Sequence, residues 1–188
     1  MAPVVYIDLA SPYAYLAFER AESVLGVAPR FEVVLVGAIF NWRDRGSWAL
    51  TERRATGIAE IERRAADYGL PPLAWPEHWP ANSLHANRVA LWAESRDALV
   101  PFAGALFRRQ FAGGEDIVDH DVLRAAARDV GLPPEEVEAA TGDAALKAIL
   151  KERTEAAWAA GVQGVPTTRV GDAVFFGDDR LAEAAAAR

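Results

Sequence analysis

The sequence of 188 residues contains no cysteine. A chain without cysteine cannot form disulfide bonds, bind a metal through thiolates or run a dithiol redox cycle with its own side chains. Histidine is scarce as well, and His78, His85 and His120 include no pair at the i,i+4 spacing of helical zinc sites. The composition therefore predicts no metal site and argues against a protein disulfide oxidoreductase.

Features that would indicate a polyanionic partner or a membrane are missing too. A formal net charge of −7 argues against nucleic acid, which requires a basic face. No apolar run approaches the roughly 20 residues of a membrane span, and no basic segment precedes an apolar one at the N-terminus. We therefore expect a cytoplasmic protein that binds neither nucleic acid nor membranes.

Apolar residues make up 52% of the sequence, which is enough to build the core of one domain. Pro3–Leu9 and Phe31–Val36 are short apolar runs rich in β-branched residues, so both are predicted to be buried strands. Between them, apolar residues at helical spacing follow Ser11 and Pro12 and stop at Gly26. A strand, a helix and a strand at this spacing indicate a βαβ unit with parallel strands.

The chain from about residue 50 to 160 has helical patterns and almost no strand signal. The predicted helices span Thr51–Tyr68, Ser83–Arg96, Val100–Phe111, Asp119–Val130, Pro133–Ala140 and Asp143–Ala160. Strand signals return at Pro166–Val170 and Ala173–Phe176, which flank the turn Gly171-Asp172 and predict an antiparallel hairpin. We therefore predict one α/β domain that is interrupted by a helical insertion.

Ser11, in the stretch LASPYAYLA, is the main candidate for chemistry, and two interpretations of it stay open. Ser followed by Pro is a common helix start, so Ser11 can be a simple N-cap. The start of a helix also collects unpaired N–H groups and about half a positive charge, so Ser11 can instead donate a hydrogen bond to a bound anion. A hydrolase nucleophile is disfavoured, because Ala10 and Pro12 replace the glycines of the Gly-x-Ser-x-Gly elbow.

A second group of candidates lies near the end of the chain. Val165-Pro166 is either an ordinary edge-strand start or a cis peptide that offers the Val165 backbone to an extended ligand. Asp178 and Asp179 either favour a helix dipole or bind a ligand ammonium group. Aromatic residues between 40 and 80 either pack the junction of the two parts or form a wall for a flat substrate. These are Phe40, Trp42, Trp48, Trp75 and Trp79.

Three segments together, LASPYAYLA, TEAAWAAGVQGVPT and FFGDDRL, resemble the 2-hydroxychromene-2-carboxylate isomerases and the kappa-class glutathione transferases. That group belongs with the DsbA-like proteins of the thioredoxin superfamily. The resemblance implies that residues 1–40 and 161–188 form a thioredoxin-like fold and that residues 41–160 form an all-helical insertion. It also implies a homodimeric, glutathione-dependent isomerase or transferase that acts on an aromatic electrophile.

The resemblance also assigns roles to individual residues. SPYA, at 11–14, occupies the place of a C-x-x-C motif in redox relatives, and Ser11 would hydrogen-bond the sulfur of glutathione. The Val165 backbone, at a cis-proline turn formed with Pro166, would pair with the cysteinyl part of the tripeptide. Asp178 and Asp179 would hold its γ-glutamyl end.

The loop AIFNWRDRGSWAL departs from the family pattern of a lysine and an asparagine in a Gly-rich loop. Asn41, Arg43 and Arg45 are the candidates to replace them, and we predict that Asn41 contacts glutathione. We also predict that Tyr13, Trp42 and Arg43 contribute to the pocket for the second substrate. Because of the departure, another low-molecular-weight thiol stays open as the ligand. A non-catalytic thioredoxin-fold module that binds peptides or thiols is the alternative function.

Overall fold

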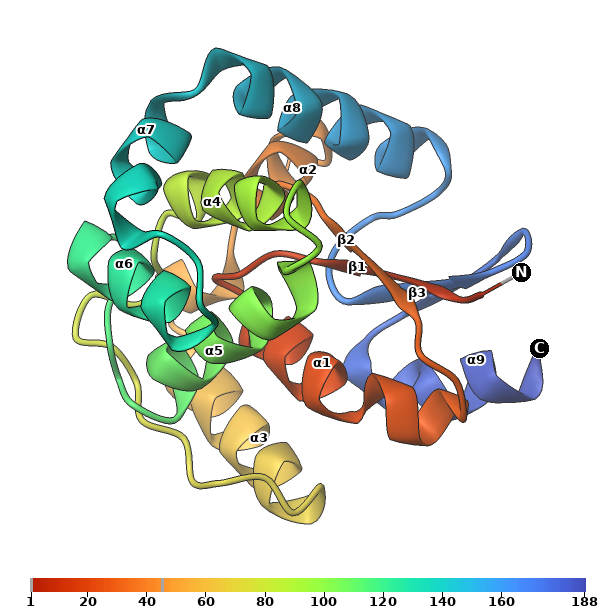
Figure 1. The fold of residues 1–188 in the computed structure, drawn as a ribbon. Coiled ribbons are helices and arrows are strands. Elements are labelled where there is room, and N and C mark those ends of the chain that lie inside the picture. Colours follow the sequence, from red (N-terminus) through yellow and green to blue (C-terminus); the bar gives the residue numbers. More distant parts are fainter. Residues whose placement is uncertain (1, 45) are drawn as a thin grey trace.

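The computed structural model describes residues 2–44 and 46–188, so the candidate Arg45 lies outside the described residues. A four-stranded sheet runs through the thioredoxin-like part in the order β2-β1-β3-β4 (Figure 1). β1 and β2 are parallel, and β3 pairs antiparallel with both β1 and β4. The predicted parallel pair and the predicted hairpin are thus both confirmed. The strands are β1 (Val4–Ile7), β2 (Arg30–Val33), β3 (Thr167–Val170) and β4 (Ala173–Phe176).

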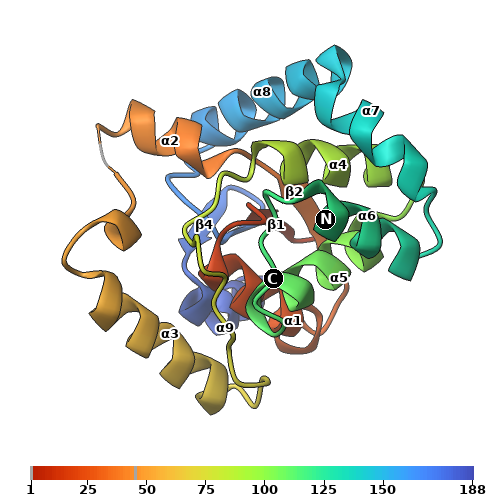
Figure 2. The same cartoon turned by 90° about the vertical axis from the view of Figure 1, so that its left-hand side faces the viewer.

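Helices fill most of the chain between β2 and β3. In chain order the α-helices are α1 (Pro12–Leu25), α2 (Val36–Trp42), α3 (Arg54–Asp67), α4 (Leu84–Glu94), α5 (Leu99–Phe111), α6 (His120–Asp129), α7 (Val137–Gly142), α8 (Ala144–Ala159) and α9 (Leu181–Ala186). Three short 3₁₀ helices are η1 (Trp48–Leu50), η2 (Pro134–Glu136) and η3 (Asp178–Arg180). In Figure 2, α3 stands at the periphery of the molecule, away from α4 to α8. None of the described helices is long and apolar enough to cross a membrane.

Helices cover both faces of the sheet, which explains why every residue of β1 is buried (Figure 1). Alternate residues of a strand point to opposite faces. Val5 and Ile7 belong to the large core that includes α1 and α9, whereas Val4 and Tyr6 belong to a smaller cluster beside α8. A strand that is buried on both sides reads as a continuous apolar run rather than an alternating one, as the sequence does here.

The end of the second strand differs from the prediction. The predicted strand extended to Val36, but this residue is the first of α2, a helix that the sequence analysis did not predict. The N–H of Leu35 donates to Thr154 Oγ1 at 3.0 Å, and the N–H of Val36 donates to Asp8 Oδ2 at 2.9 Å. Because side chains distant in the sequence bind these donors, the chain leaves the ladder and turns into a helix.

Asp8 follows β1 directly and is fully buried. Its carboxylate accepts hydrogen bonds from the backbone N–H groups of Ala10 and Val36, each at 2.9 Å. It also accepts from the Ser83 hydroxyl at 2.9 Å and from the Asn87 amide at 3.2 Å. Burial raises the pKa of Asp8, and these four donors oppose the rise because they stabilise the ionised form. The cluster ties the turn after β1 to the starts of α2 and α4.

Replacing Asn87 should test how much this buried polar cluster contributes to stability. The Asn87 Oδ1 atom accepts from the N–H of Leu9 at 3.1 Å, and its amide donates to Asp8, Ser83 and the carbonyl of Val34. Asn87→Ala leaves several buried groups unpaired, so we expect the free energy of unfolding to fall by about 2–4 kcal/mol in urea titrations.

Asn82→Ala is the matched control for this measurement. Asn82 is exposed and accepts a single hydrogen bond, from the N–H of Leu84 at 3.0 Å. Its loss should cost at most about 1 kcal/mol. Equal effects of the two substitutions would show that the cluster around Asp8 makes no special contribution.

Candidate functional site

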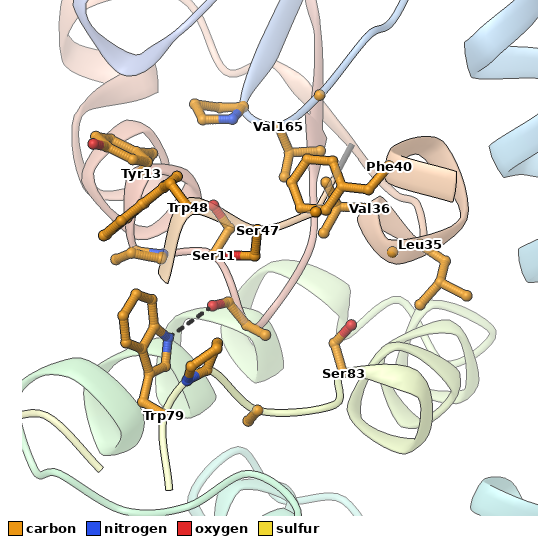
Figure 3. Close-up of a pocket in the computed structure, with 18 of the residues that line it drawn as sticks. Ser11, Tyr13, Leu35, Val36, Phe40, Ser47, Trp48, Trp79, Ser83 and Val165 are labelled. Atoms are coloured by element: carbon orange, nitrogen blue, oxygen red, sulfur yellow. Dashed lines mark hydrogen bonds between the residues drawn. The ribbon is translucent and has the colours of Figure 1, made fainter. Parts of the chain in front are cut away.

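A cavity of about 1020 Å³ lies where β1 leads into α1. The first residues of α1, α2, η1 and α4 all belong to its lining. In Figure 3, Ser11 sits near the middle of the lining, with Phe40 and Val165 to one side and Trp48 and Trp79 to the other. The structure thus gathers segments from both ends and the middle of the chain around Ser11.

Ser11 is the N-cap residue of α1, as the sequence predicts. Its Oγ accepts a hydrogen bond from the N–H of Ala14 at 3.2 Å. Pro12 at the first helical position has no N–H, and the N–H of Tyr13 has no acceptor among the described residues. The hydroxyl proton of Ser11 has no acceptor in this part of the chain either. The helix start therefore presents an O–H and an N–H that are both available to a ligand.

The Val165–Pro166 peptide lies in the same lining and is cis, which was one of the two predicted alternatives. Neither the N–H nor the C=O of Val165 takes part in a hydrogen bond within residues 2–44 and 46–188. The C=O of Pro166 accepts from the N–H of Gly177 at 2.9 Å, so this turn is fixed to the acidic turn that follows β4. The free backbone groups of Val165 can therefore pair with an extended ligand that lies beside Ser11.

Asp178 and Asp179 both line the cavity but differ in their surroundings. The Asp178 side chain is only 1% exposed; it accepts from Arg64 at 2.9 Å and from the Tyr68 hydroxyl at 3.0 Å. Burial raises the pKa of Asp178, while Arg64 and Tyr68 oppose this shift. The Asp179 side chain is 53% exposed, and its one ion pair among the described residues is with Arg64, at 3.4 Å. The carboxylate of Asp178 is thus already bound by Arg64 and Tyr68, whereas that of Asp179 has spare capacity for a ligand.

Arg64 of α3 is a charged lining residue that could not be placed at the site from the sequence. Its guanidinium pairs with Glu60 at 2.6 Å as well as with the two aspartates, and it lies 5.6 Å from the ring centroid of Tyr13. Three carboxylates around one guanidinium leave this end of the cavity negatively charged. The i,i+4 spacing to Glu60 could be read from the sequence, but the partner at position 178 could not.

Only some of the other predicted site residues lie in the cavity lining. Asn41 lines the cavity, as does Tyr13. Trp42 and Arg43 do not belong to the lining: Trp42 packs against Trp158 with ring centroids 5.8 Å apart, and Arg43 donates to the C=O of Gln163 at 2.7 Å. Trp42 and Arg43 therefore lie outside the cavity lining, and their predicted contribution to a second-substrate pocket stays a prediction.

The histidines lie outside the cavity as well. His85 Nδ1 and His120 Nε2 share a hydrogen bond at 2.9 Å, and His120 Nδ1 contacts Glu138 Oε2 at 2.8 Å. The described lining of the cavity contains no histidine that could act as a base for Ser11. Within residues 2–44 and 46–188, no group of three or more His, Cys, Asp or Glu side chains could hold a metal ion.

Comparisons with known proteins agree with this geometry. A family model described as a DSBA-like thioredoxin domain matches residues 4–187. The chain belongs to this family. It is 30% identical over 191 residues to 2-hydroxychromene-2-carboxylate isomerase of Sphingobium xenophagum, a match that covers 94% of this chain and 92% of the relative. It is 26% identical over 194 residues to glutathione S-transferase kappa 1 of Homo sapiens, with 94% and 86% covered.

The fold comparison leads to the same group. A solved structure of a 2-hydroxychromene-2-carboxylate isomerase superposes on this DsbA-like chain with a TM-score of 0.85 at 22% sequence identity, and the match covers 100% of this chain and 94% of that one. Both the predicted resemblance and the predicted thioredoxin-like fold with helical additions are therefore confirmed.

The paired histidines predict a pH effect on stability. Burial lowers the pKa of His85, and the charges of His120 and Arg88 lower it further, against the opposing effect of Glu138. The folded chain therefore takes up this proton at a lower pH than the unfolded chain, whose histidine titrates near ~6.5, and acid favours unfolding. We expect His85→Gln to reduce the fall in melting temperature between about pH 7 and about pH 5.

His78→Gln is the control for this measurement, because the His78 side chain is 77% exposed and lies 3.8 Å from Asp116. Only the change that His85→Gln shows beyond that of His78→Gln is assigned to the histidine pair. An identical profile for His85→Gln and the unmodified chain would show that His85 titrates alike in both states.

Proposed function

We propose that the cavity binds glutathione and that the chain is a glutathione-dependent isomerase or transferase that acts on an aromatic electrophile. One observation carries the proposal: the Ser11 hydroxyl, whose proton has no acceptor among the described residues, stands at a helix start in a large cavity that Val165, with its backbone unpaired in the same part of the chain, also lines. The similarity to an isomerase and to a kappa-class glutathione transferase supports the same reading.

Ser11 acts in this proposal on the sulfur of the bound thiol and is not itself the nucleophile. A free thiol has a pKa near ~8.5, so only a few per cent is thiolate at neutral pH. The helix start stabilises an anion, and a hydroxyl adds a charge-assisted hydrogen bond. Lowering the thiol pKa by about 1–2 units needs roughly 1.4–2.7 kcal/mol, which these two effects can supply together.

The rest of the cavity suits the remainder of a γ-glutamyl tripeptide. The half-exposed carboxylate of Asp179 would accept from the α-ammonium group at the negatively charged end. The backbone N–H and C=O of Val165 would pair with the cysteinyl residue and bring its sulfur beside Ser11. Asn41 also lines the cavity, and it would contact the glycyl end.

The chemistry then follows from the absence of a protein thiol. A serine cannot form a mixed disulfide with the ligand, so the bound thiolate stays free to attack carbon. Its electron pair forms the C–S bond to a conjugated substrate, and the displaced π electrons move to a substrate oxygen. In an isomerase, rotation occurs about the former C=C bond of the substrate, which is now single, before the electrons return and expel the thiolate. In a transferase the C–S bond remains.

Removing the hydroxyl of Ser11 should separate catalysis from stability. We expect Ser11→Ala to lower kcat/KM for glutathione and a chromogenic aromatic electrophile by about tenfold at neutral pH, because the thiol pKa rises. The lost cap should cost only about 1 kcal/mol of stability. The readouts are initial rates, the pH profile of thiolate absorbance in the complex, and urea unfolding.

Ser11→Thr retains a capping hydroxyl and should restore most of the activity. If Ser11→Ala keeps the rate and the pH profile while losing stability, Ser11 serves as a cap alone. A chain that binds glutathione but turns over no electrophile would instead support the non-catalytic thiol-binding module.

The acidic turn gives a second test. Asp179→Ala should weaken glutathione binding by about tenfold in calorimetry, since a hydrogen bond to a charged group contributes roughly 1.5–3 kcal/mol. Asp67→Ala is a matched control, because the Asp67 side chain is 57% exposed and likewise pairs with an arginine, Arg63. Equal dissociation constants for both variants would remove Asp179 from the binding site.

A further inference from the structure

A column of aromatic rings runs from the core to the cavity. Tyr15 stacks on Phe111 at 5.6 Å between ring centroids, Phe111 contacts Trp75 at 5.9 Å, and Trp75 contacts Trp79 at 4.6 Å. Trp79 then contacts Trp48 at 5.6 Å, and both tryptophans line the cavity (Figure 3). Trp48 is therefore the member of the column that lies furthest from the core residue Tyr15.

The indole ring of Trp48 packs against Gly57 of α3. The six-membered part of its indole lies directly on the backbone of α3 at Gly57, where an added Cβ would come within 2.5 Å of Cε3 and 2.7 Å of Cη2. The ring of Tyr13 meets its edge at a centroid distance of 6.1 Å and an interplanar angle of 66°. With these neighbours on its other sides, the half-buried indole presents its remaining surface to the cavity.

The far end of the column lies close to the position proposed for the thiol. The indole N–H of Trp79 donates to the C=O of Ala10 at 3.3 Å, so the column is attached to the residue that precedes Ser11. A volume of about 1020 Å³ stands at the upper end of the roughly 300–1,000 Å³ of small-molecule sites. The cavity thus has room for a second molecule beside a thiol.

We propose that Trp48 is the stacking face for the second substrate, that this substrate is a flat aromatic compound with an uncharged ring, and that Gly57 sets the position of that face. The inference rests on the proposed function and deepens it. Offset or edge-to-face contact with Trp48 continues the aromatic column by one ring. Gly57 is required because any side chain there would push the indole into the space that the substrate needs.

The charged groups near this face are already paired within the chain, which favours an uncharged ring. Arg54 lies 5.7 Å from the ring centroid of Trp79, outside the cavity lining, and donates to the C=O of Trp79 at 2.7 Å. Among the described lining residues the charged side chains are Arg64, Asp178 and Asp179, and all three meet at the acidic turn. The guanidinium is already shared by carboxylates, so it has little to offer a substrate acid. Around Trp48 the lining includes Tyr13, Trp79 and Leu50, which favour an apolar ring.

The test uses 2-naphthol, an uncharged bicyclic aromatic, in calorimetry with the full chain, with and without saturating glutathione. Trp48→Ala should weaken 2-naphthol binding by roughly tenfold, because the stacking contact and its buried area are lost. Trp42→Ala is the matched control: Trp42 is 43% exposed, contacts the ring of Trp158 outside the cavity lining, and should leave the affinity unchanged. Glutathione affinity should stay the same in both variants.

Gly57→Ala is a second, independent variant that adds only a methyl group. Alanine is a better helix former than glycine, so the backbone of α3 should tolerate it. The displaced indole should weaken 2-naphthol binding, whereas Gly142→Ala, at a glycine with open space around it, should not. The Gly57 variant keeps the proposal testable if Trp48→Ala fails to fold.

The outcomes separate the two proposals. Absence of 2-naphthol binding to the unmodified chain, or equal affinity in the Trp48, Gly57 and control variants, would overturn the aromatic face. Binding of 2-naphthol that depends on Trp48, in a chain that does not bind glutathione, would support the face and remove the proposed thiol chemistry.

Discussion

Asp8 joins three segments that lie far apart in the sequence: the turn before α1, the start of α2 and the start of α4. Burying a carboxylate is costly unless its oxygens are hydrogen-bonded, and here four donors satisfy them. Because these donors come from three segments of the chain, the carboxylate fixes the helix starts relative to one another. The position of Ser11 is thus determined by contacts across the whole domain as well as by its own helix.

The same arrangement gives different parts of the cavity different electrostatic potentials. The starts of α1 and α4 bring positive helix ends to the lining. Asp8 takes up the N–H groups of Ala10 and Val36, while the hydroxyl of Ser11 and the N–H of Tyr13 stay available at α1. The acidic turn forms the opposite pole, where three carboxylates surround Arg64. A ligand with an ammonium group at one end and a sulfur anion further along matches this polarity in one orientation.

The parts of the site that could be predicted from the sequence are those set by local chemistry. Ser-Pro at a helix start and the turn at Val165–Pro166 depend on neighbours in the chain. Contacts between distant residues could not be predicted: the end of β2 depends on Thr154 and Asp8, and the burial of Asp178 depends on Arg64. Similarly, composition alone could not distinguish Trp42 from Trp48. Trp42 lies in α2 and packs against Trp158 of α8, whereas Trp48 lies in η1 and lines the cavity.

The absence of cysteine acquires a physical meaning in this fold. The helix start beside the cis-proline turn favours an anion whichever molecule carries it. Under the proposed function, the serine at position 11 means that the sulfur comes from a ligand, which requires a volume that admits this ligand and a charged end that orients it. It also follows that the protein itself cannot be oxidised at this position. Under the proposed function, the occupancy of the site by a thiol, and not the redox state of the chain, determines whether the second substrate at Trp48 reacts.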